Sequence, residues 1–290
     1  MDASQEPAGA GFDEVRARCV ENLRRPISIV HRRFERRPPL YPPTPWLSWA
    51  LAVLLLAGIC VVLLDDAAGR YWQHWPSPLK VFAEETTPLG LGKWYLLPPL
   101  AWLMVANQID WNSLSRERLV AAYNRTCLSF FVLIAVGLPG LATLGIKLLV
   151  GRERPFDYQD VGILSFHPFK LSPLYASFPS GHSTTVGAVA GVIMLLCPRW
   201  KYGVMLAAVW IASTRVLLGA HYPSDAVTGF GLGLGLSIMT AQVFARLGFL
   251  FRQTSASLPV LRRSMRAREH SQDGPRQDAA ATDAVLPERG

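Results

Sequence analysis

Residues 46–64 read WLSWALAVLLLAGICVVLL, nineteen consecutive positions without a charged side chain. An α-helix of about 20 residues is long enough to cross the roughly 30 Å hydrocarbon core of a bilayer. Asp65 and Asp66 follow at once, and we expect them to mark the end of this span. The run is too long for the apolar core of a signal peptide, so the sequence predicts an uncleaved membrane anchor.

The rest of the chain has the composition of a membrane protein. Of its 290 residues, 50% are hydrophobic and 17% are charged, which is too apolar for an ordinary soluble domain. Pro98 and Pro99 lie in the second apolar run, where they should kink the helix or confine its regular part to the residues after them. Together the apolar runs predict an all-α, polytopic bundle of six transmembrane helices, at 46–64, 94–109, 128–150, 181–197, 202–219 and 226–250.

This pattern divides the chain into three parts. We expect residues 1–45 to form a basic cytoplasmic tail, residues 46–250 the membrane domain and residues 251–290 a disordered cytoplasmic tail. Arginines of the first part can contact anionic lipid headgroups, although a topology signal alone is the simpler explanation. The net charge of +8 does not indicate nucleic-acid binding, because the basic residues flank apolar runs instead of forming a basic surface with interleaved aromatic residues.

Lys and Arg residues are unequally divided between the two ends of the predicted spans. With both termini in the cytoplasm, the inner segments carry 20 of the 29 Lys and Arg residues and the outer segments carry 6. Cytoplasmic loops retain such residues, whereas translocated loops are depleted of them. We therefore expect both termini inside the cell, and the span ends near residues 150, 180 and 220 outside it.

Three polar clusters lie at those outer ends, where ionisable groups are costly and usually functional. Lys147 and Arg154 are seven residues apart, so they can share one face of a helix that Pro155 stops. The alternative explanation is that the Lys147 and Arg154 side chains only extend along the apolar surface to place their charges at the membrane interface. The second cluster is Pro-Ser-Gly-His at 179–182, which opens the fourth span.

The second cluster has the features of an anion site. A helix N-terminus presents unpaired N–H groups, and Gly181 lets an anion approach the backbone closely. For Ser180 alone a simple helix cap is the better explanation, whereas His182 has no such explanation. These residues therefore predict contact with a negatively charged group.

The third cluster is Arg215, followed by His221 and Asp225. His and Asp four residues apart can meet if the turn between them is helical, and a carboxylate then fixes the tautomer of the imidazole. Asp225 could instead only cap the sixth span. Three cations, a helix N-terminus and two histidines at one membrane face describe a site for an oxyanion.

Together these clusters resemble the signature of the type 2 phosphatidic acid phosphatase family, which shares its active-site plan with vanadium haloperoxidases. The family pattern is Lys-x6-Arg-Pro, Pro-Ser-Gly-His and Ser-Arg-x5-His-x3-Asp, and it falls on 147–155, 179–182 and 214–225. Thr214 stands where the family has serine and keeps the hydroxyl group. The motifs cover residues 147–225, and the span layout extends the likeness to about 94–250.

The resemblance implies a membrane enzyme that hydrolyses a lipid phosphate through a phosphohistidine, with neither a metal nor another cofactor. It implies that His221, oriented by Asp225, is the nucleophile, and that His182 is first the general acid and then the base. Phosphoryl transfer depends mainly on positioning and on charge neutralisation. The residues implied to bind the phosphate are Lys147, Arg154, Ser180, Gly181 and Arg215.

The expected partners are a lipid-phosphate substrate and membrane lipids, and the expected location is the cell membrane with the site on its extracytoplasmic face. The substrate stays open among phosphatidic acid, phosphatidylglycerol phosphate, a polyprenyl diphosphate and a phosphorylated glycolipid. A phosphotransferase that passes the phosphate to another lipid or sugar is an alternative. A transporter is disfavoured, because the charges lie at one end of the spans and no internal repeat is visible.

Overall fold

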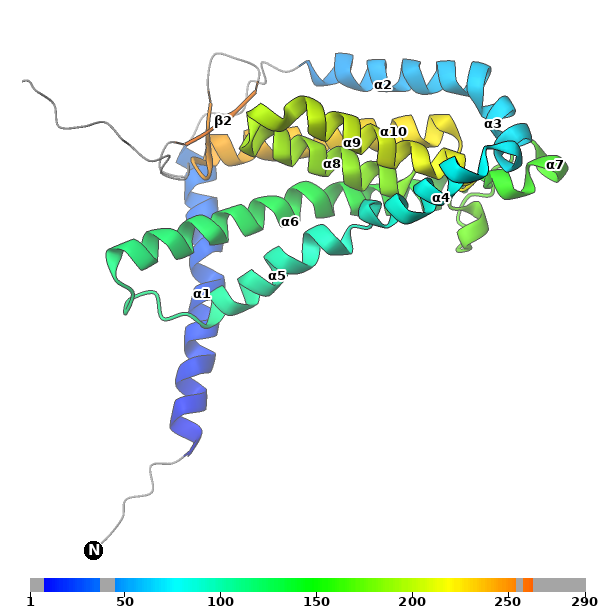
Figure 1. Ribbon diagram of the computed structural model, residues 1–290. Coiled ribbons are helices and arrows are strands. Elements are labelled where there is room, and N and C mark those ends of the chain that lie inside the picture. Colours follow the sequence, from blue (N-terminus) through cyan, green and yellow to red (C-terminus); the bar gives the residue numbers. More distant parts are fainter. Residues whose placement is uncertain (1–7, 37–44, 254–257, 263–290) are drawn as a thin grey trace, which may run out of the picture.

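The computed structural model describes residues 8–36, 45–253 and 258–262. Long helices run side by side as a bundle, and one further helix, α1, crosses them near one end (Figure 1). The centre of the bundle consists of α6 (Arg116–Val150), α8 (Gly181–Leu196), α9 (Lys201–Leu217) and α10 (Pro223–Leu247). On its outside, α2 (Trp46–Cys60) packs against α10 and α5 (Lys93–Gln108) packs against α6.

Each of the six predicted span ranges is occupied largely by helix. Within the described residues, three helical segments are long and apolar enough to cross a membrane, namely Trp46–His74, Arg116–Val150 and Pro223–Leu247. Gly181–Leu196 is apolar but shorter. The structure therefore agrees with a polytopic helical membrane protein.

Glycines allow α8 and α10 to pack closely. A Cβ atom on Gly233 would lie 2.0 Å from the carbonyl oxygen of Thr184, and one on Gly187 would lie 2.4 Å from that of Phe230. Small residues at such positions let helix backbones approach, which is the usual way that helices associate in a membrane. This close packing holds the first turns of α8 and α10 beside each other.

Short elements connect the long helices. Along the chain they are the π-helical turn η1 (Val61–Asp65), α3 (Asp66–Tyr71), η2 (Trp72–His74), α4 (Ser77–Thr86), η3 (Thr87–Gly90), η4 (Pro155–Asp157), α7 (Tyr158–Val161), η5 (Pro173–Tyr175) and η6 (Pro198–Trp200). The segments α3, α4 and α7 lie at the end of the bundle away from α1 (Figure 1).

Two predictions about helix ends were wrong. The helical segment that begins at Trp46 does not end at Asp65 and Asp66 but continues to His74. Asp65 is fully buried and pairs with Arg152 instead of being exposed to water. Helix α5 begins at Lys93, so its regular part is not confined to the residues after Pro98 and Pro99, which was one of the two effects expected of these prolines. Both prolines lie inside α5, where each removes one intrahelical N–H donor, and the helix continues through them to Gln108.

The two predicted tails contain regular structure where the chain is described. Residues Ala8–Arg36 form α1, and Phe251–Arg252 (β1) pairs antiparallel with Val260–Leu261 (β2). The prediction that disorder begins at residue 251 was wrong, because Phe251 is buried against Phe131 with ring centroids 4.9 Å apart. The remainder of the predicted tails, at 1–7, 37–44, 254–257 and 263–290, lies outside the described residues.

Candidate active site

The three sequence clusters meet at the end of the bundle where α6 ends and where α8 and α10 begin. The N–H of Ser180 donates to the carbonyl oxygen of Asp225 over 3.0 Å, which joins the starts of α8 and α10. Electrostatic interactions join His182 to Arg215, His221, Arg154 and Lys147. The fold therefore places the predicted residues of all three motifs in one site.

Arg154 reaches the site by a route that the sequence did not predict. Helix α6 ends at Val150, and Gly151 closes it in the left-handed conformation at φ 60°. A Cβ atom on Gly151 would lie 1.9 Å from the carbonyl oxygen of His167, so only glycine fits there. The prediction that Lys147 and Arg154 share one helix face was wrong, because the chain turns away before Arg154.

The loop after α6 holds Arg154 through its backbone. The N–H of Arg154 donates to the carbonyl oxygen of Leu174 over 3.2 Å, and the N–H of Ser177 donates to that of Arg152 over 3.0 Å. The ammonium of Lys147 donates to the carbonyl oxygens of Ala176 and Ser177. Both cations are thereby tied to the segment that leads into Ser180.

Arg215 extends from the last turn of α9 and donates from Nη1 to Thr87 Oγ1 over 3.0 Å. The Nε atoms of Arg154 and Arg215 are buried, and neither has a hydrogen-bond partner among the described residues. Buried donors without acceptors are costly. An oxyanion between the two guanidinium groups would satisfy both of them.

Ser180 is the N-cap of α8, which is one of the two roles expected for it, the other being phosphate binding. Its Oγ accepts from the N–H of Ser183 over 3.4 Å and from the Ser183 hydroxyl over 3.0 Å. The residue is fully buried. Gly181 opens the helix and is partly exposed, so the positive end of the helix dipole faces the site.

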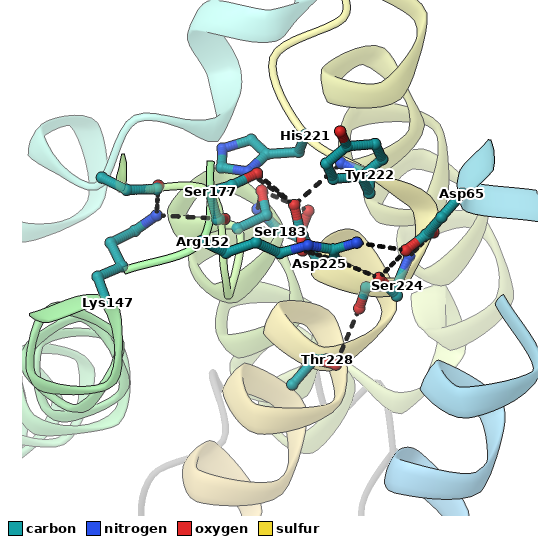
Figure 2. Close-up of polar contacts among 12 residues, drawn as sticks. Asp65, Lys147, Arg152, Ser177, Ser183, His221, Tyr222, Ser224, Asp225 and Thr228 are labelled. Carbon is teal, nitrogen blue, oxygen red and sulfur yellow. Dashed lines mark hydrogen bonds and ion pairs between the residues drawn. The ribbon is translucent and has the colours of Figure 1, made fainter. Parts of the chain in front are cut away.

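His221 lies just before α10 and Asp225 lies in its first turn, so the two side chains are neighbours. His221 Nδ1 is 3.6 Å from Asp225 Oδ2, and both side chains are almost completely buried. The same oxygen accepts from the N–H of Tyr222 over 2.9 Å and from the Ser177 hydroxyl. Because Nδ1 faces the carboxylate (Figure 2), Nε2 is the ring nitrogen left for chemistry.

The surroundings of His221 keep its ring neutral. The pKa of His221 is lowered to about 4, mainly by burial and also by the cations Lys147 and Arg154, while Asp225 opposes this shift. At neutral pH the imidazole therefore has a free electron pair. This is the protonation state that a nitrogen nucleophile requires.

Several residues of the site were missed in the sequence. Arg152 Nη1 lies 2.7 Å from Asp225 Oδ1, and its Nη2 lies 2.9 Å from Asp65 Oδ2 (Figure 2). Thr87 binds Arg215, and Ser177 binds Asp225. Arg152 lies within the first motif and Ser177 lies two residues before the second, whereas Asp65 and Thr87 are far from the motifs in the sequence.

The amino-acid sequence of the chain is similar to those of known proteins. Residues 128–249 match the profile of the PAP2 superfamily. A lipid A 1-phosphatase of Rhizobium johnstonii is 34% identical over 238 residues, which cover 82% of this chain and 96% of that protein. An undecaprenyl-diphosphatase of Sulfolobus acidocaldarius is 30% identical over 98 residues, or 33% of this chain and 46% of that one.

Among solved structures, a PAP2-type phosphatidylglycerolphosphate phosphatase of Bacillus subtilis is similar with a TM-score of 0.47 and 24% identity, over 69% of this chain and 94% of that one. The sequence relationship to the R. johnstonii protein extends over nearly the whole of that relative. The chain therefore belongs to the PAP2 superfamily and is a phosphoric-ester hydrolase.

Proposed function

We propose that the chain removes phosphate from a membrane lipid through a phosphohistidine on His221. The observation that carries this proposal is the neutral, buried imidazole of His221, with Nδ1 against Asp225 and cations around it. The proposed phosphate ligands are the ones expected from the sequence: Lys147, Arg154, Ser180, Gly181 and Arg215. The proposed catalytic residues are His182, His221 and Asp225.

The reaction has two steps in this scheme. Nε2 of His221 attacks the phosphorus atom, the P–O bond to the lipid breaks, and His182 gives a proton to the departing alkoxide. His182 then takes a proton from water, the water oxygen attacks phosphorus, and the P–N bond breaks. The products are inorganic phosphate and the lipid alcohol, and His221 and His182 return to their starting forms.

For the substrate, we propose phosphate at position 1 of lipid A or of a similar phosphorylated glycolipid. The relative with 96% of its length aligned is a lipid A 1-phosphatase, whereas the undecaprenyl-diphosphatase aligns over 46% of its length. The longer alignment extends well beyond the region 128–249 that carries the superfamily profile.

We propose further that six helices cross the membrane, that both termini are cytoplasmic and that the site faces outward. The charge distribution of 20 inner against 6 outer Lys and Arg residues supports this orientation. At the site end of the bundle, the loop before α8 exposes apolar side chains, with Leu171 at 91% and Phe169 at 69%. Such residues suit the outer surface of a bilayer, from which a lipid headgroup enters the site.

Helix α1 supports the same orientation from the opposite end of the bundle. It runs across the other helices (Figure 1) and binds the ends of two of them, since Asn22 donates to the carbonyl oxygen of Asn107 over 2.8 Å and Arg33 to that of Leu247 over 3.1 Å. An exposed apolar stripe lies beside this contact, formed by Val20, Leu23, Ile27 and Val30. We propose that the inner lipid leaflet covers it.

Spin labels in proteoliposomes test the position of α1. A label at Ile27 should be reached by oxygen more readily than by a water-soluble nickel complex, and a label at Ser28 should show the reverse. If both labels are equally open to nickel, the stripe does not lie in lipid. If Ile27 is closed to both reagents, another protein chain covers it.

Phosphate release from purified enzyme tests the proposed function. The substrates are lipid A 1-phosphate, phosphatidic acid, undecaprenyl diphosphate and an aryl phosphate, each with and without an acceptor lipid. We expect release to be fastest from lipid A 1-phosphate and independent of the acceptor. His182→Ala should impair lipid phosphates more than the aryl phosphate, because a phenolate leaves without a proton; equal losses would remove the general-acid role of His182.

A further inference from the structure

Behind His221, three charged side chains from distant parts of the sequence form a buried chain. Arg152 lies between Asp65 and Asp225, with N–O distances of 2.9 Å and 2.7 Å. The exposed fractions of Asp65, Arg152 and Asp225 are 0%, 3% and 0%. Charges are buried to this degree only where they are paired, and removing one partner leaves the others uncompensated.

Ser224 ties this chain of charges to α10. Its N–H donates to Asp65 Oδ1 over 3.0 Å, its hydroxyl donates to Asp65 Oδ2, and its Oγ accepts from Arg152 Nη1 over 2.7 Å. Asp65 therefore holds the first turn of the helix that carries Asp225 (Figure 2). The guanidinium of Arg152 also lies 4.2 Å from the centre of the Tyr222 ring.

The local backbone turns Asp65 toward this network. Residues Val61–Asp65 form a π-helical turn between α2 and α3, and such turns insert one residue and are frequent at functional sites. After it, Asp65 faces inward to Arg152, whereas the side chain of Asp66 is 48% exposed and pairs with Arg70 over 2.9 Å. Two adjacent carboxylates thus have opposite surroundings.

We propose that Asp65 and Arg152 are positioning residues that fix and electrically balance the Asp225 carboxylate for His221. This inference rests on the proposed function, in which His221 is the nucleophile. Neither residue touches the substrate in this scheme. Asp65 is the last residue of η1, directly after α2, and this segment lies outside the region 128–249 that matches the superfamily profile.

The charges explain why both residues are required. Burial opposes the charged form of Arg152, but Asp225 and Asp65 more than compensate and raise its pKa, so the guanidinium stays cationic. Arg152 alone would neutralise Asp225, and Asp65 takes up part of that positive charge. Asp225 then keeps enough negative charge to stabilise the imidazole as His221 becomes positive during phosphoryl transfer.

The groups that face His221 come from four elements. They are Asp225 of α10, Lys147 of α6, Arg154 of the loop after α6 and His182 of α8. Substitutions at Asp65 and Arg152 leave all four groups in place. A change in the pH dependence of the variants therefore reports the network behind Asp225.

The test compares Asp65→Asn, Arg152→Gln and the double variant with Asp66→Asn as a matched control. We expect each of the first two to lower kcat by about 10- to 100-fold, because a small displacement of the His221–Asp225 pair is costly, while KM stays within about twofold. The double variant should be no slower than the worse single variant, because residues that act as a unit are not additive. Asp66→Asn should retain wild-type kcat.

The pH profile of kcat/KM separates positioning from support of the fold. Arg152→Gln removes a cation near His221, so the acid limb of this variant should lie about one pH unit higher than that of the wild type. Asp65→Asn removes an anion and should not move the limb to higher pH. Arg152→Lys should return the limb toward the wild-type position. Variants are compared as monodisperse protein after gel filtration, so that loss of folded protein is not read as loss of kcat.

Two results separate failure of this inference from failure of the proposed function. If folded Asp65→Asn has wild-type kcat and an unchanged profile, or if its KM rises in place of a fall in kcat, Asp65 is not a positioning residue. If folded His221→Ala still releases phosphate at the wild-type rate, the phosphohistidine scheme itself is overturned.

Discussion

Arg215 donates a hydrogen bond from Nη1 to Thr87 Oγ1 over 3.0 Å, which connects the candidate phosphate site to a short turn about sixty residues away from the first motif. The same threonine oxygen accepts from the Thr214 hydroxyl over 3.0 Å. At the end of the same turn, a Cβ atom on Gly90 would lie 2.7 Å from the His182 ring. The turn η3 therefore packs against two of the proposed site residues.

Thr87→Val should lower kcat/KM by about tenfold, because the substitution keeps the shape of the side chain and removes an acceptor for a charged donor. Thr87→Ser keeps the hydroxyl and should retain most of the activity. Thr86→Val is a matched control, since Thr86 binds Trp210 and not Arg215. Phosphate-release kinetics on all three variants check this, and equal kcat/KM for Thr87→Val and Thr86→Val would contradict it.

His221→Ala should lower phosphate release by at least about 10³-fold while the protein still inserts and folds, because the proposed nucleophile is lost. Asp225→Asn should lose less activity but more stability. Its carboxylate is the partner of buried Arg152, and breaking such a pair costs about 3–5 kcal/mol. Phosphate release and thermal unfolding in detergent measure the two effects. A folded His221→Ala protein with substantial turnover would exclude the nucleophile role.

Much of this site could be predicted from the sequence, because its residues lie in three motifs whose order and spacing are specific. The positions of His182, Arg215 and Asp225 relative to helix ends followed from apolar length and flanking charge. The fold brings all of them to one end of the bundle. Membrane helices are well suited to such prediction. Each span must form its backbone hydrogen bonds internally, so it is a long apolar helix that can be recognised by its length.

The remainder of the site was missed for two different physical reasons. Asp65 reads as the charged end of a span, and only the packing of α2 against α10 reveals that it is buried. Arg154 was placed on α6, but Gly151 ends that helix earlier. For Asp65 a tertiary interaction decided the outcome, whereas Gly151 is a local signal for the end of a helix that the prediction did not use.

The site should work without a metal ion, because Lys147, Arg154 and Arg215 with the N-terminus of α8 already supply positive charge for the phosphoryl oxygens. We expect activity to survive EDTA and to be inhibited by vanadate, which resembles the pentacoordinate transition state. Phosphate release with EDTA, and with EDTA followed by Mg²⁺, checks this. Complete loss that Mg²⁺ restores would show that the cations are insufficient.

A cysteine at Gln159 should react with a membrane-impermeant thiol reagent in intact cells, and a cysteine at Ser115 should not. Both positions are exposed, and they lie near opposite ends of α6. Cys197 is exposed as well and is first replaced by serine. Labelling after permeabilisation confirms that Ser115→Cys is reactive. The reverse pattern in intact cells would move the site to the cytoplasm.

The low pKa of His221 determines the pH dependence that we expect for the reaction. Because burial lowers that pKa to about 4, the acid limb of kcat/KM should lie near pH 4 instead of near 6.5, the ordinary value for histidine. Below this limb the ring is protonated and has no electron pair for attack. The phosphate of the substrate also ionises, so two substrates with different phosphate pKa values are compared; the enzyme limb stays in place while the substrate limb moves.

The same shift affects stability, with a definite sign. The folded pKa lies below the unfolded value of about 6.5, so the unfolded chain binds more protons between pH 6.5 and 4. The free energy of unfolding should therefore fall as the pH is lowered through this window, by on the order of 3 kcal/mol from this residue. His221→Gln, which cannot titrate, should lose less stability over the same range. An enzyme limb that stays at pH 6.5 with both substrates would mean that His221 is not held neutral by burial.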